Sequence, residues 1–167
     1  ETLNNANVEA YAADTQARWG AKSKSNIWFG YKRHESVDMR YGLINKIAVT
    51  PANVPDYRVL RSLLPKGGMV FADKLYDCKS ADMQIKASGC HAGTIRKNNN
   101  KAKNRDLDRW RSGVRMPFEG VFSKQRKRAR YRGTAKVFMQ CVFEALCHNL
   151  RKAIKILPQP SMIPIRV

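Results

Sequence analysis

The chain has 167 residues, a length that fits one domain. Its 43% hydrophobic content predicts a packed core and excludes a disordered basic tail. Thirty-two Lys and Arg against thirteen acids give a formal charge of +19, which predicts a polyanionic partner, most simply DNA or RNA. No apolar run reaches the roughly 20 residues of a membrane helix, so we expect no membrane partner.

A hairpin is the first clear structure in the chain. Residues 1–26 are interpreted as a lead-in segment, with weak apolar periodicity over most of their length. The aromatic and β-branched residues of 27–38 then predict a strand, and 43–50 predict a second strand that pairs back onto it across a turn at 39–42. A domain spanning 27–157 is therefore expected.

Strands and helices alternate through the middle of the chain. We predict a helix over 56–64 with Asp56 as its N-cap, because Val59, Leu60, Leu63 and Leu64 share one face. The apolar run 69–72 predicts a buried strand that ends at Asp73. A helix over 80–87, capped by Ser80 and stopped by Gly89, and a short strand over 91–95 follow.

The last third of the chain is predicted to be helical. After a polar loop at 98–104, a helix is expected over 106–111. Gly113 and Pro117 interrupt the pattern, so the helix that bears Glu119 is expected to start near Pro117 or to be kinked there. The strongest helical periodicity covers 134–156, with Thr134 as its expected cap, and 158–167 form an irregular tail with three prolines. This order of elements predicts a mixed α/β fold.

Two acids stand out as candidate metal ligands. Asp73 would lie at the carboxyl end of a buried strand, where open α/β sheets place their ligands, and Glu119 would lie on a helix next to a dense basic run. Phosphodiester chemistry commonly uses two divalent ions bound by several carboxylates. Taken alone, a single Asp at a strand end is more often a turn cap, so the two acids are a weak signal without their surroundings.

Five short words, in the same order along the chain, strengthen this hypothesis. They resemble bacterial insertion-sequence transposases of the DDE class, in the group with a Tyr-Arg-Glu-Lys signature around its last acid. The resemblance extends from about Leu3 to about Ile156. The words are Ala13-Asp14-Thr15-Gln16-Ala17-Arg18-Trp19-Gly20, Phe29-Gly30-Tyr31-Lys32-Arg33-His34-Glu35-Ser36-Val37-Asp38, Thr50-Pro51-Ala52-Asn53-Val54-Pro55-Asp56, Phe71-Ala72-Asp73-Lys74-Leu75-Tyr76 and Arg130-Tyr131-Arg132-Gly133-Thr134-Ala135-Lys136.

The resemblance implies a fold, a reaction and a set of roles. The fold would be a ribonuclease-H-like mixed sheet flanked by helices and lacking its first strand. The reaction would be DNA cleavage and strand transfer at insertion-element ends, with two divalent ions, magnesium or manganese. Asp73 would be the second acid of the catalytic triad and Glu119 the third, with Arg115 one helical turn earlier as in the signature. A bacterial, nucleoid-associated cytoplasmic location and a homodimer of the full-length protein are further implications.

The chain also departs from the family pattern. The signature Tyr would fall at Ser112, the signature Lys at Arg126, and Leu75 replaces the usual Gly after the second acid. A rival alignment, which matches Pro117 and Phe118, places Arg115 itself at the position of the last acid. The first catalytic Asp of the family lies upstream of the Asp14 word.

Two other acids could stand in for that missing Asp, but neither lies in the matching word. Asp38 is interpreted as a hairpin-turn residue, and Asp14 as a structural residue that pairs with Arg18 or caps a turn. We therefore expect an amino-terminally truncated enzyme that is inactive by itself.

The basic segment is the candidate DNA-binding surface. Fourteen Lys and Arg against three acids lie between residues 96 and 132, with aromatic residues among them that could stack on bases. The residues assigned to DNA binding are Arg115, Lys124, Arg126, Lys127, Arg128, Arg130 and Arg132. Most charge runs are solvated surface, and a non-catalytic basic DNA- or RNA-binding protein, or an inert transposase remnant, is the competing interpretation. Dependence on a divalent metal separates the two.

Overall fold

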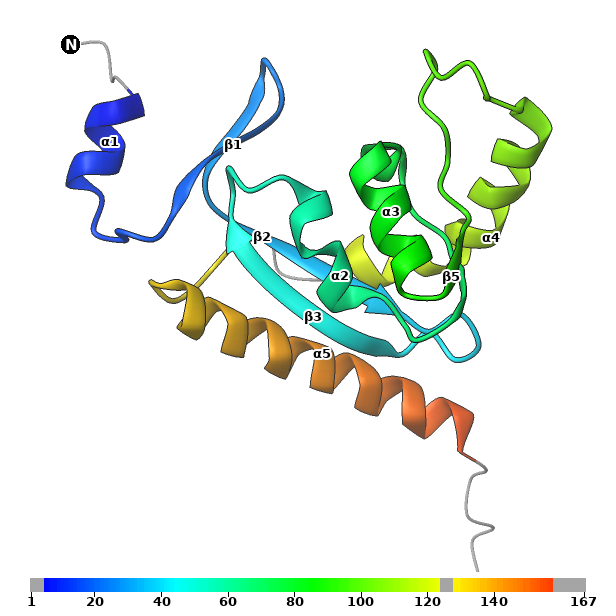
Figure 1. Cartoon of the computed structure of the whole chain (residues 1–167). Helices are drawn as coiled ribbons and strands as arrows, with labels where there is room; N and C mark the ends of the chain where they lie inside the picture. Colours follow the sequence, from blue (N-terminus) through cyan, green and yellow to red (C-terminus); the bar gives the residue numbers. More distant parts are fainter. Residues whose placement is uncertain (1–4, 124–127, 158–167) are drawn as a thin grey trace, which may run out of the picture.

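The computed structural model of the chain describes residues 5–123 and 128–157 (Figure 1). The tail predicted for 158–167 lies outside this part, as do Lys124, Arg126 and Lys127. The elements are α1 (Asn5–Tyr11), β1 (Arg18–Ser23), β2 (Asn26–Val37), β3 (Ile44–Pro51), η1 (Asp56–Val59), α2 (Leu60–Leu63), β4 (Gly68–Val70), η2 (Lys74–Tyr76), α3 (Lys79–Ala87), β5 (Cys90–Ala92), α4 (Arg105–Ser123) and α5 (Thr134–Ile156). The fold is mixed α/β, as predicted.

The predicted hairpin forms the longer part of a three-stranded antiparallel sheet. β2 pairs with β3 from Tyr31 to Val37, and the connecting turn has Gly42 in the left-handed region at φ 70°. β1, which the sequence analysis did not anticipate, pairs with the first half of β2. This pairing brings Gly20 so close to the segment after β3 that a Cβ atom there would lie 2.7 Å from the Cβ of Ala52.

A separate two-stranded sheet holds β4 and β5. The two strands are parallel, with Met69 opposite His91. Hydrogen bonds extend the pairing beyond the assigned strands, because Gly93 N–H donates to the Val70 carbonyl at 2.8 Å and Ile95 N–H donates to the Ala72 carbonyl at 3.0 Å. The strands predicted at 69–72 and 91–95 are therefore confirmed. Asp73 follows Ala72, the last residue of this pairing, three positions after Val70, at which β4 as assigned ends.

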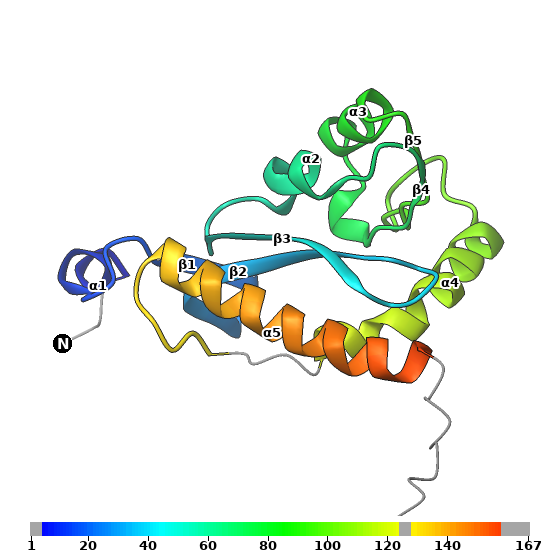
Figure 2. The same cartoon turned by 90° about the horizontal axis from the view of Figure 1, so that it is seen from below.

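Helices lie on both faces of the three-stranded sheet. Figure 2 shows α5 along one face of β2 and β3, with α2 and α3 on the other. On the α5 face, Ala145 packs with Ile44 and with Val121 from α4. On the other face, Ile85 of α3 packs with Leu60 in the larger buried cluster. None of the described helices is long and apolar enough to cross a membrane.

The predicted N-caps are wrong, whereas the predicted stop at Gly89 is confirmed, because α3 ends at Ala87 and Gly89 follows with φ 69°. Asp56 does not cap the turn that follows it; its carboxylate accepts from Lys32 at 3.0 Å instead. Ser80 lies inside α3, which begins after Cys78. Thr134 is the first residue of α5, and its N–H donates to the side chain of Gln16 at 2.7 Å. The segment 56–64 also divides into a 3-10 turn and one α-helical turn.

The helix that bears Glu119 does not start at Pro117. α4 is one element from Arg105 to Ser123, with Pro117 inside it. A proline ring crowds the carbonyl four residues earlier, and here that residue is Gly113, which has no side chain and open space around its α-carbon. The apolar contact of Val121 with Ile44 gives the helix a reason to continue beyond Pro117.

Gly20 offers a direct test of this packing. We expect Gly20→Ala to lower the free energy of unfolding by about 1–3 kcal/mol, because the added methyl group would overlap Ala52 and the Trp28 ring. The matched control is Gly113→Ala, where the methyl group enters open space within a helix and should stabilise by up to about 1 kcal/mol. Thermal unfolding measures both, and equal effects would contradict the packing described here.

Candidate active site

Asp73 lies where β4 gives way to the turn η2. Its backbone is extended, and its side chain caps the turn by accepting from Leu75 N–H at 3.3 Å, while Tyr76 N–H donates to its carbonyl at 3.0 Å. The side chain is half-buried. Asp73 therefore does act as a turn cap, the common role of a single Asp at a strand end. This backbone contact uses one carboxylate oxygen, so the second oxygen of Asp73 can bind another ligand.

Tyr76 reports which charges gather around Asp73. The pKa of Tyr76 is raised to about 12, chiefly by burial and then by the negative charges of Asp56 and Asp73, while the positive charge of Arg115 opposes the rise. η1, which carries Asp56, also contacts η2 directly. Asp73 therefore shares its surroundings with a second acid that the site prediction did not include.

The even-numbered residues of β2 face this same region. The Lys32 ammonium pairs with the Asp56 carboxylate and donates to the Val54 carbonyl, both at 3.0 Å. Two residues on, the buried His34 ring contacts the Thr50 hydroxyl at 2.9 Å. Burial lowers the pKa of His34, so this imidazole is neutral at pH 7. The His34 ring is thus buried and held by the Thr50 hydroxyl of β3.

Glu119 is not brought into contact with Asp73 by any described interaction. It lies on the exposed side of α4 and makes no hydrogen bond or ion pair with another described residue. Arg115, one turn earlier, is half-buried and is close enough to Tyr76 to act on its pKa. Within residues 5–123 and 128–157, no group of three His, Cys, Asp or Glu residues could hold a metal ion.

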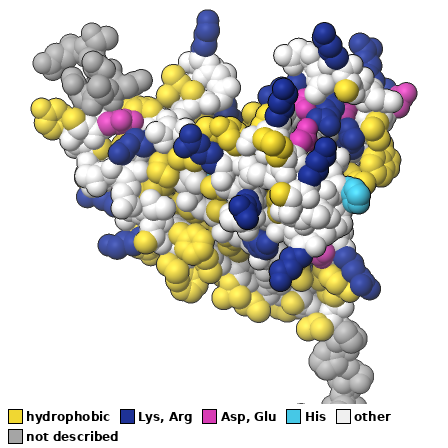
Figure 3. Space-filling model, viewed as in Figure 1, with side chains coloured by type: hydrophobic (Ala, Val, Ile, Leu, Met, Phe, Trp, Pro, Cys, Tyr) yellow, Lys and Arg dark blue, Asp and Glu magenta, His cyan; other side chains and the backbone are white. Residues whose placement is uncertain are grey.

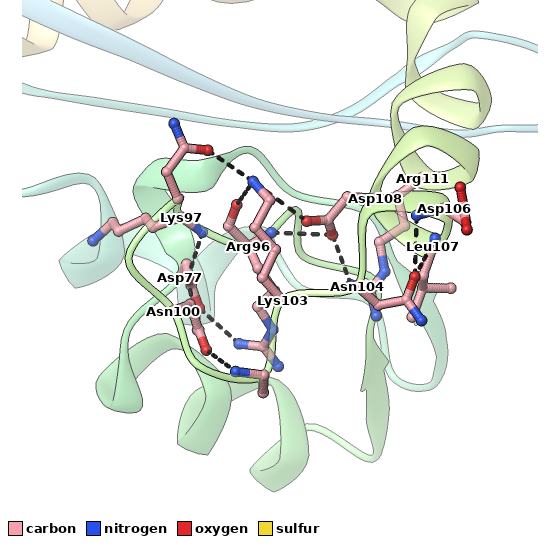
Figure 4. A network of polar contacts seen from close by, with 12 residues as sticks. Asp77, Arg96, Lys97, Asn100, Lys103, Asn104, Asp106, Leu107, Asp108 and Arg111 are labelled. Atoms are coloured by element: carbon pink, nitrogen blue, oxygen red, sulfur yellow. Dashed lines mark hydrogen bonds and ion pairs between the residues drawn. The ribbon is translucent and has the colours of Figure 1, made fainter.

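Two buried acids fix the loop between β5 and α4 (Figure 4). Asp77 accepts from Arg96 at 2.7 Å, from Lys97 N–H at 2.7 Å and from the amide of Asn100 at 2.9 Å. Burial by itself would raise the pKa of Asp77, but these donors outweigh it and hold the pKa below its usual value. Asp108 accepts from the backbone N–H of Arg96 at 3.2 Å, so Arg96 is held by Asp77 through its side chain and by Asp108 through its backbone.

An open hollow of about 570 Å³ lies between this loop, η2 and α4. Its lining includes four cationic side chains and one buried acid. These are Lys74, Lys103, Arg105, Arg109 and Asp108. Because Lys74 directly follows Asp73, the hollow begins beside the candidate metal ligand.

The four predicted DNA-binding residues that the structure describes fall into two separate groups. Arg115 lies on α4 near Tyr76, whereas the exposed Arg128, Arg130 and Arg132 precede α5. That second group is held against the start of α5, where the Gln140 side chain accepts from Arg130 N–H at 2.9 Å. Figures 1 and 2 place the start of α4 and the start of α5 at opposite sides of the molecule, whereas the end of α4 reaches α5, where Val121 packs with Ala145.

The two substitute acids considered in the sequence have structural roles. The Asp14 carboxylate accepts from the Tyr31 hydroxyl at 2.8 Å and from Gly133 N–H at 3.0 Å, and it caps its own turn. It therefore joins β2 to the start of α5. Asp38 accepts from Tyr41 N–H at 2.7 Å within the hairpin turn. The interpretation of both residues as structural is confirmed.

The comparisons with known proteins agree with the resemblance found in the sequence. Residues 7–150 match the family described as the transposase DDE domain. Over 160 residues the chain is 34% identical to the transposase for insertion sequence element IS1106 of Neisseria meningitidis serogroup B. This match covers 89% of the chain but 55% of that relative, so the chain spans about half of its length. No solved structure matches the chain. The chain belongs to the DDE transposases of bacterial insertion sequences.

The sequence analysis missed the residues that organise the site. Asp77 and Arg96 were not singled out as a pair, although they fix the basic loop. The Lys32–Asp56 pair was also missed, even though both residues lie in words quoted for the family. Lys32 and Asp56 are 24 positions apart and Asp77 and Arg96 are 19 apart, so only the fold shows that they meet.

Asp77 gives a pH-dependent prediction. Because its pKa is lower in the folded than in the unfolded chain, its stabilising contribution is complete above about pH 4 and is lost as the pH falls through the folded-state value. Asp77→Asn should therefore lower the free energy of unfolding by about 2 kcal/mol at pH 7 and by less at acidic pH. Urea unfolding at a series of pH values measures this.

The matched control is Asp106→Asn. Asp106 pairs with Arg109 on the surface, where its side chain is 90% exposed, so its loss should change stability very little. If the two variants lost the same free energy at pH 7, Asp77 would not be the anchor described here.

Proposed function

We propose that this chain is the larger part of the catalytic core of an insertion-sequence transposase, which cuts DNA at element ends and joins it to target DNA. The observation that carries the proposal is the position of Asp73 at the carboxyl end of β4, beside a second acid and a basic hollow. Family membership and the charge of +19 support DNA as the substrate. On the same grounds, we propose the bacterial nucleoid as its location and a homodimer as the full-length state.

The backbone of β4 supports a missing neighbour in the sheet. Val70 and Ala72 direct their carbonyls towards β5. Because successive residues of a strand point their backbone groups to opposite sides, Met69 and Phe71 direct theirs to the other edge. No described backbone group bonds to Met69 or Phe71 on that edge. An exposed edge of this kind is a template for another strand.

β2 has a similar edge in its second half. Ala52 N–H donates to the Gly30 carbonyl at 3.0 Å, so the even-numbered residues of β2 bond to β3 and Arg33 directs its backbone groups away from it. β1 covers this second edge only as far as Gly30. One further strand, antiparallel to β2 and parallel to β4, would pair with both edges and join the two sheets into one.

Such a strand would end beside Asp73. Lys32 at the near end of this edge pairs with Asp56, and Asp56 and Asp73 both act on Tyr76. The carboxyl end of β4 therefore lies at the end of β2 where the added strand would finish. An acid at the end of that strand would complete a site of the ribonuclease-H type, with Asp73 and Glu119 as the other two acids. We propose that a segment outside the described residues supplies it, and that the present chain is inactive without it.

Asp73 fits the role of a ligand for magnesium or manganese. It is a carboxylate, the hard-oxygen ligand that both ions prefer, and one oxygen has no described partner. Glu119 fits by chemistry and exposure. Two bound ions would supply activation of the attacking oxygen and stabilisation of the leaving oxygen. The chain itself would hold the ions through these two acids and orient the DNA strand through its cations.

The basic hollow supports a path for the DNA backbone. Lys74, Arg105 and Arg109 line it and can neutralise phosphate groups, and Lys74 directly follows Asp73 in the chain. The exposed Arg128, Arg130 and Arg132, which precede α5, would then contact a different part of the DNA from Arg115, which lies near Tyr76. Lys124, Arg126 and Lys127 stay proposed DNA contacts outside the described residues.

A non-catalytic DNA- or RNA-binding protein, or an inert remnant, is the second candidate. One observation favours it: the α4 residue that acts on Tyr76 is the cationic Arg115, while Glu119 is exposed. If Arg115 occupies the position of the third acid, as the rival alignment has it, the positive charge repels a metal ion. The two placements predict different effects of substitution.

Manganese binding to variants of this chain separates the placements. With Glu119 as a ligand, Asp73→Asn and Glu119→Gln should each weaken manganese binding about tenfold, since each removes one charged ligand. Electron paramagnetic resonance of free manganese gives the affinities. Asp106→Asn, which removes an exposed acid from the same helix, is the control and should change nothing.

Arg115→Glu tests the rival placement from the other side. If Glu119→Gln has no effect and Arg115→Glu tightens manganese binding about tenfold, then Arg115 stands where the third acid belongs and our assignment of Glu119 is wrong. If Asp73→Asn also has no effect, the metal site itself is wrong and the binding-protein interpretation is left.

Amide exchange tests the open edge of β4. The N–H groups of Met69 and Phe71 should exchange at least about tenfold faster than those of Gly93 and Ile95, which are hydrogen-bonded to β4. Hydrogen exchange followed by nuclear magnetic resonance measures each amide. In a polypeptide that carries the additional strand, Met69 and Phe71 should become protected. Strong protection of both amides in the present chain would mean that no strand is missing from this edge.

A further inference from the structure

The loop between β5 and α4 is a fixed projection of the molecule. It consists of two successive turns, because Asn100 N–H donates to the Lys97 carbonyl and Lys103 N–H donates to the Asn100 carbonyl, both at 3.1 Å. The Asn100 amide also donates to both oxygens of the buried Asp77 carboxylate, at 3.0 and 2.9 Å (Figure 4). Figure 1 shows this loop rising to the edge of the molecule beside α4. A loop fixed in this way loses little conformational freedom when it binds a partner.

Three consecutive asparagines in this loop have different surroundings. Asn100 holds Asp77 through its side-chain nitrogen. The side-chain oxygen of Asn98 accepts from the Lys103 ammonium at 2.7 Å. Asn99 lies exposed in the first turn, and its side chain makes no hydrogen bond with any described residue. The Asn99 amide is therefore ready to donate and to accept at the same time with a partner outside the chain.

The charge around Asn99 fits a nucleic-acid backbone. Lys97 and Lys101 flank it, both are exposed, and neither makes an ion pair among the described residues. The segment from one lysine to the other contains no acid. Figure 3 shows several Lys and Arg side chains at this end of the molecule. The loop also adjoins the basic hollow, which Asn98 and Lys103 line, so a DNA backbone in that hollow would lie beside the loop.

The lengths of these side chains favour contact with a DNA groove. An Asn side chain is short, so Asn99 reaches a base edge only where the loop itself enters a groove, and the longer Lys97 and Lys101 then reach the phosphates on either side. The minor groove, about 6 Å wide, is too narrow for a loop of two turns, whereas the major groove is about 12 Å wide. In the major groove, the base that an asparagine amide pairs with through two hydrogen bonds is adenine.

We propose that Asn99 reads an adenine in the major groove of the bound DNA, with Lys97 and Lys101 on the adjacent phosphates. The inference rests on the proposed function for its DNA substrate, and it adds a residue that distinguishes one DNA sequence from another. The side-chain oxygen of Asn99 would accept from the adenine N6 amino group, and its nitrogen would donate to adenine N7. The other three bases do not present this pair of groups in the major groove.

Selection from a library of duplexes with a randomised central segment tests this inference. With the full chain at low salt, sequencing of the bound duplexes should show adenine enriched about fivefold or more at one position. Asn99→Ala should remove that enrichment, while its affinity for the unselected library stays within about twofold, since no phosphate contact is lost. Asn45→Ala, which removes an exposed amide on β3, is the matched control and should keep the enrichment.

The two lysines have a different expected signature. Lys97→Ala/Lys101→Ala should weaken binding to every duplex and keep the preference for adenine. The slope of log affinity against log salt should become shallower by about 1.8, because two phosphate contacts are lost. Fluorescence anisotropy of a labelled duplex at a series of salt concentrations measures this slope.

Three results would overturn the inference. A selection without a preferred base, or an adenine preference that Asn99→Ala keeps, would show that Asn99 does not read the DNA, while the proposed DNA substrate would stand. A salt slope that Lys97→Ala/Lys101→Ala leaves unchanged would place the loop away from the DNA. A chain that binds no duplex even at low salt would overturn the proposed DNA substrate together with this inference.

Discussion

The alternation of side chains along β2 is the constraint on which the two layers of this molecule depend. Odd-numbered residues face α5, where the Arg33 guanidinium binds Glu144 at 2.6 Å and the Cys141 carbonyl at 3.2 Å. Even-numbered residues face the other layer, where Lys32 binds Asp56. A shift of one residue in the register of β2 would exchange these two faces and break both sets of contacts. The long strand thus positions α5 and the candidate active site at the same time.

The same geometry makes the candidate site an incomplete edge. Parallel pairing with β5 uses one side of β4 and leaves the backbone of Met69 and Phe71 directed to the other. Asp73 follows at the carboxyl end, the position at which open α/β sheets hold ligands. The basic loop that lines the adjacent hollow is itself fixed, because Arg96 and Lys97 donate to the Asp77 carboxylate. The described residues therefore form the loop and the hollow around the candidate site, but they do not bring together a full set of metal ligands.

Local pattern predicted the elements that depend on local pattern. The hairpin of β2 and β3, the strand before Asp73 and the long helix α5 all have a clear apolar period, and the structure confirms them. β1 was not predicted, because its residues have no strand-like alternation and it forms by pairing with β2. The N-caps were wrong for a related reason: α5 begins at side chains more than a hundred positions away, those of Asp14 and Gln16.

The sequence predicted the position of Asp73 but not the contacts that surround it. The position of Asp73 followed from an apolar run that ends on an acid, but the long-range pairs around it depend on how the strands pack. The basic run from 96 to 132 was expected to act as one surface, and instead the start of α4 and the start of α5 place its two ends on opposite sides. A sequence shows how many cations a segment carries, but only the fold shows which of them lie on the same surface.

The most direct test of the central claim is strand cleavage of labelled insertion-element end DNA with manganese or magnesium. The present chain would be compared with a polypeptide that extends it at the amino end through a strand ending in an acid. The account predicts that the extended polypeptide cuts, that its Asp73→Asn variant does not, and that the present chain binds the DNA without cutting it. An extended polypeptide that binds the DNA with the same affinity but never cuts it would contradict the catalytic assignment.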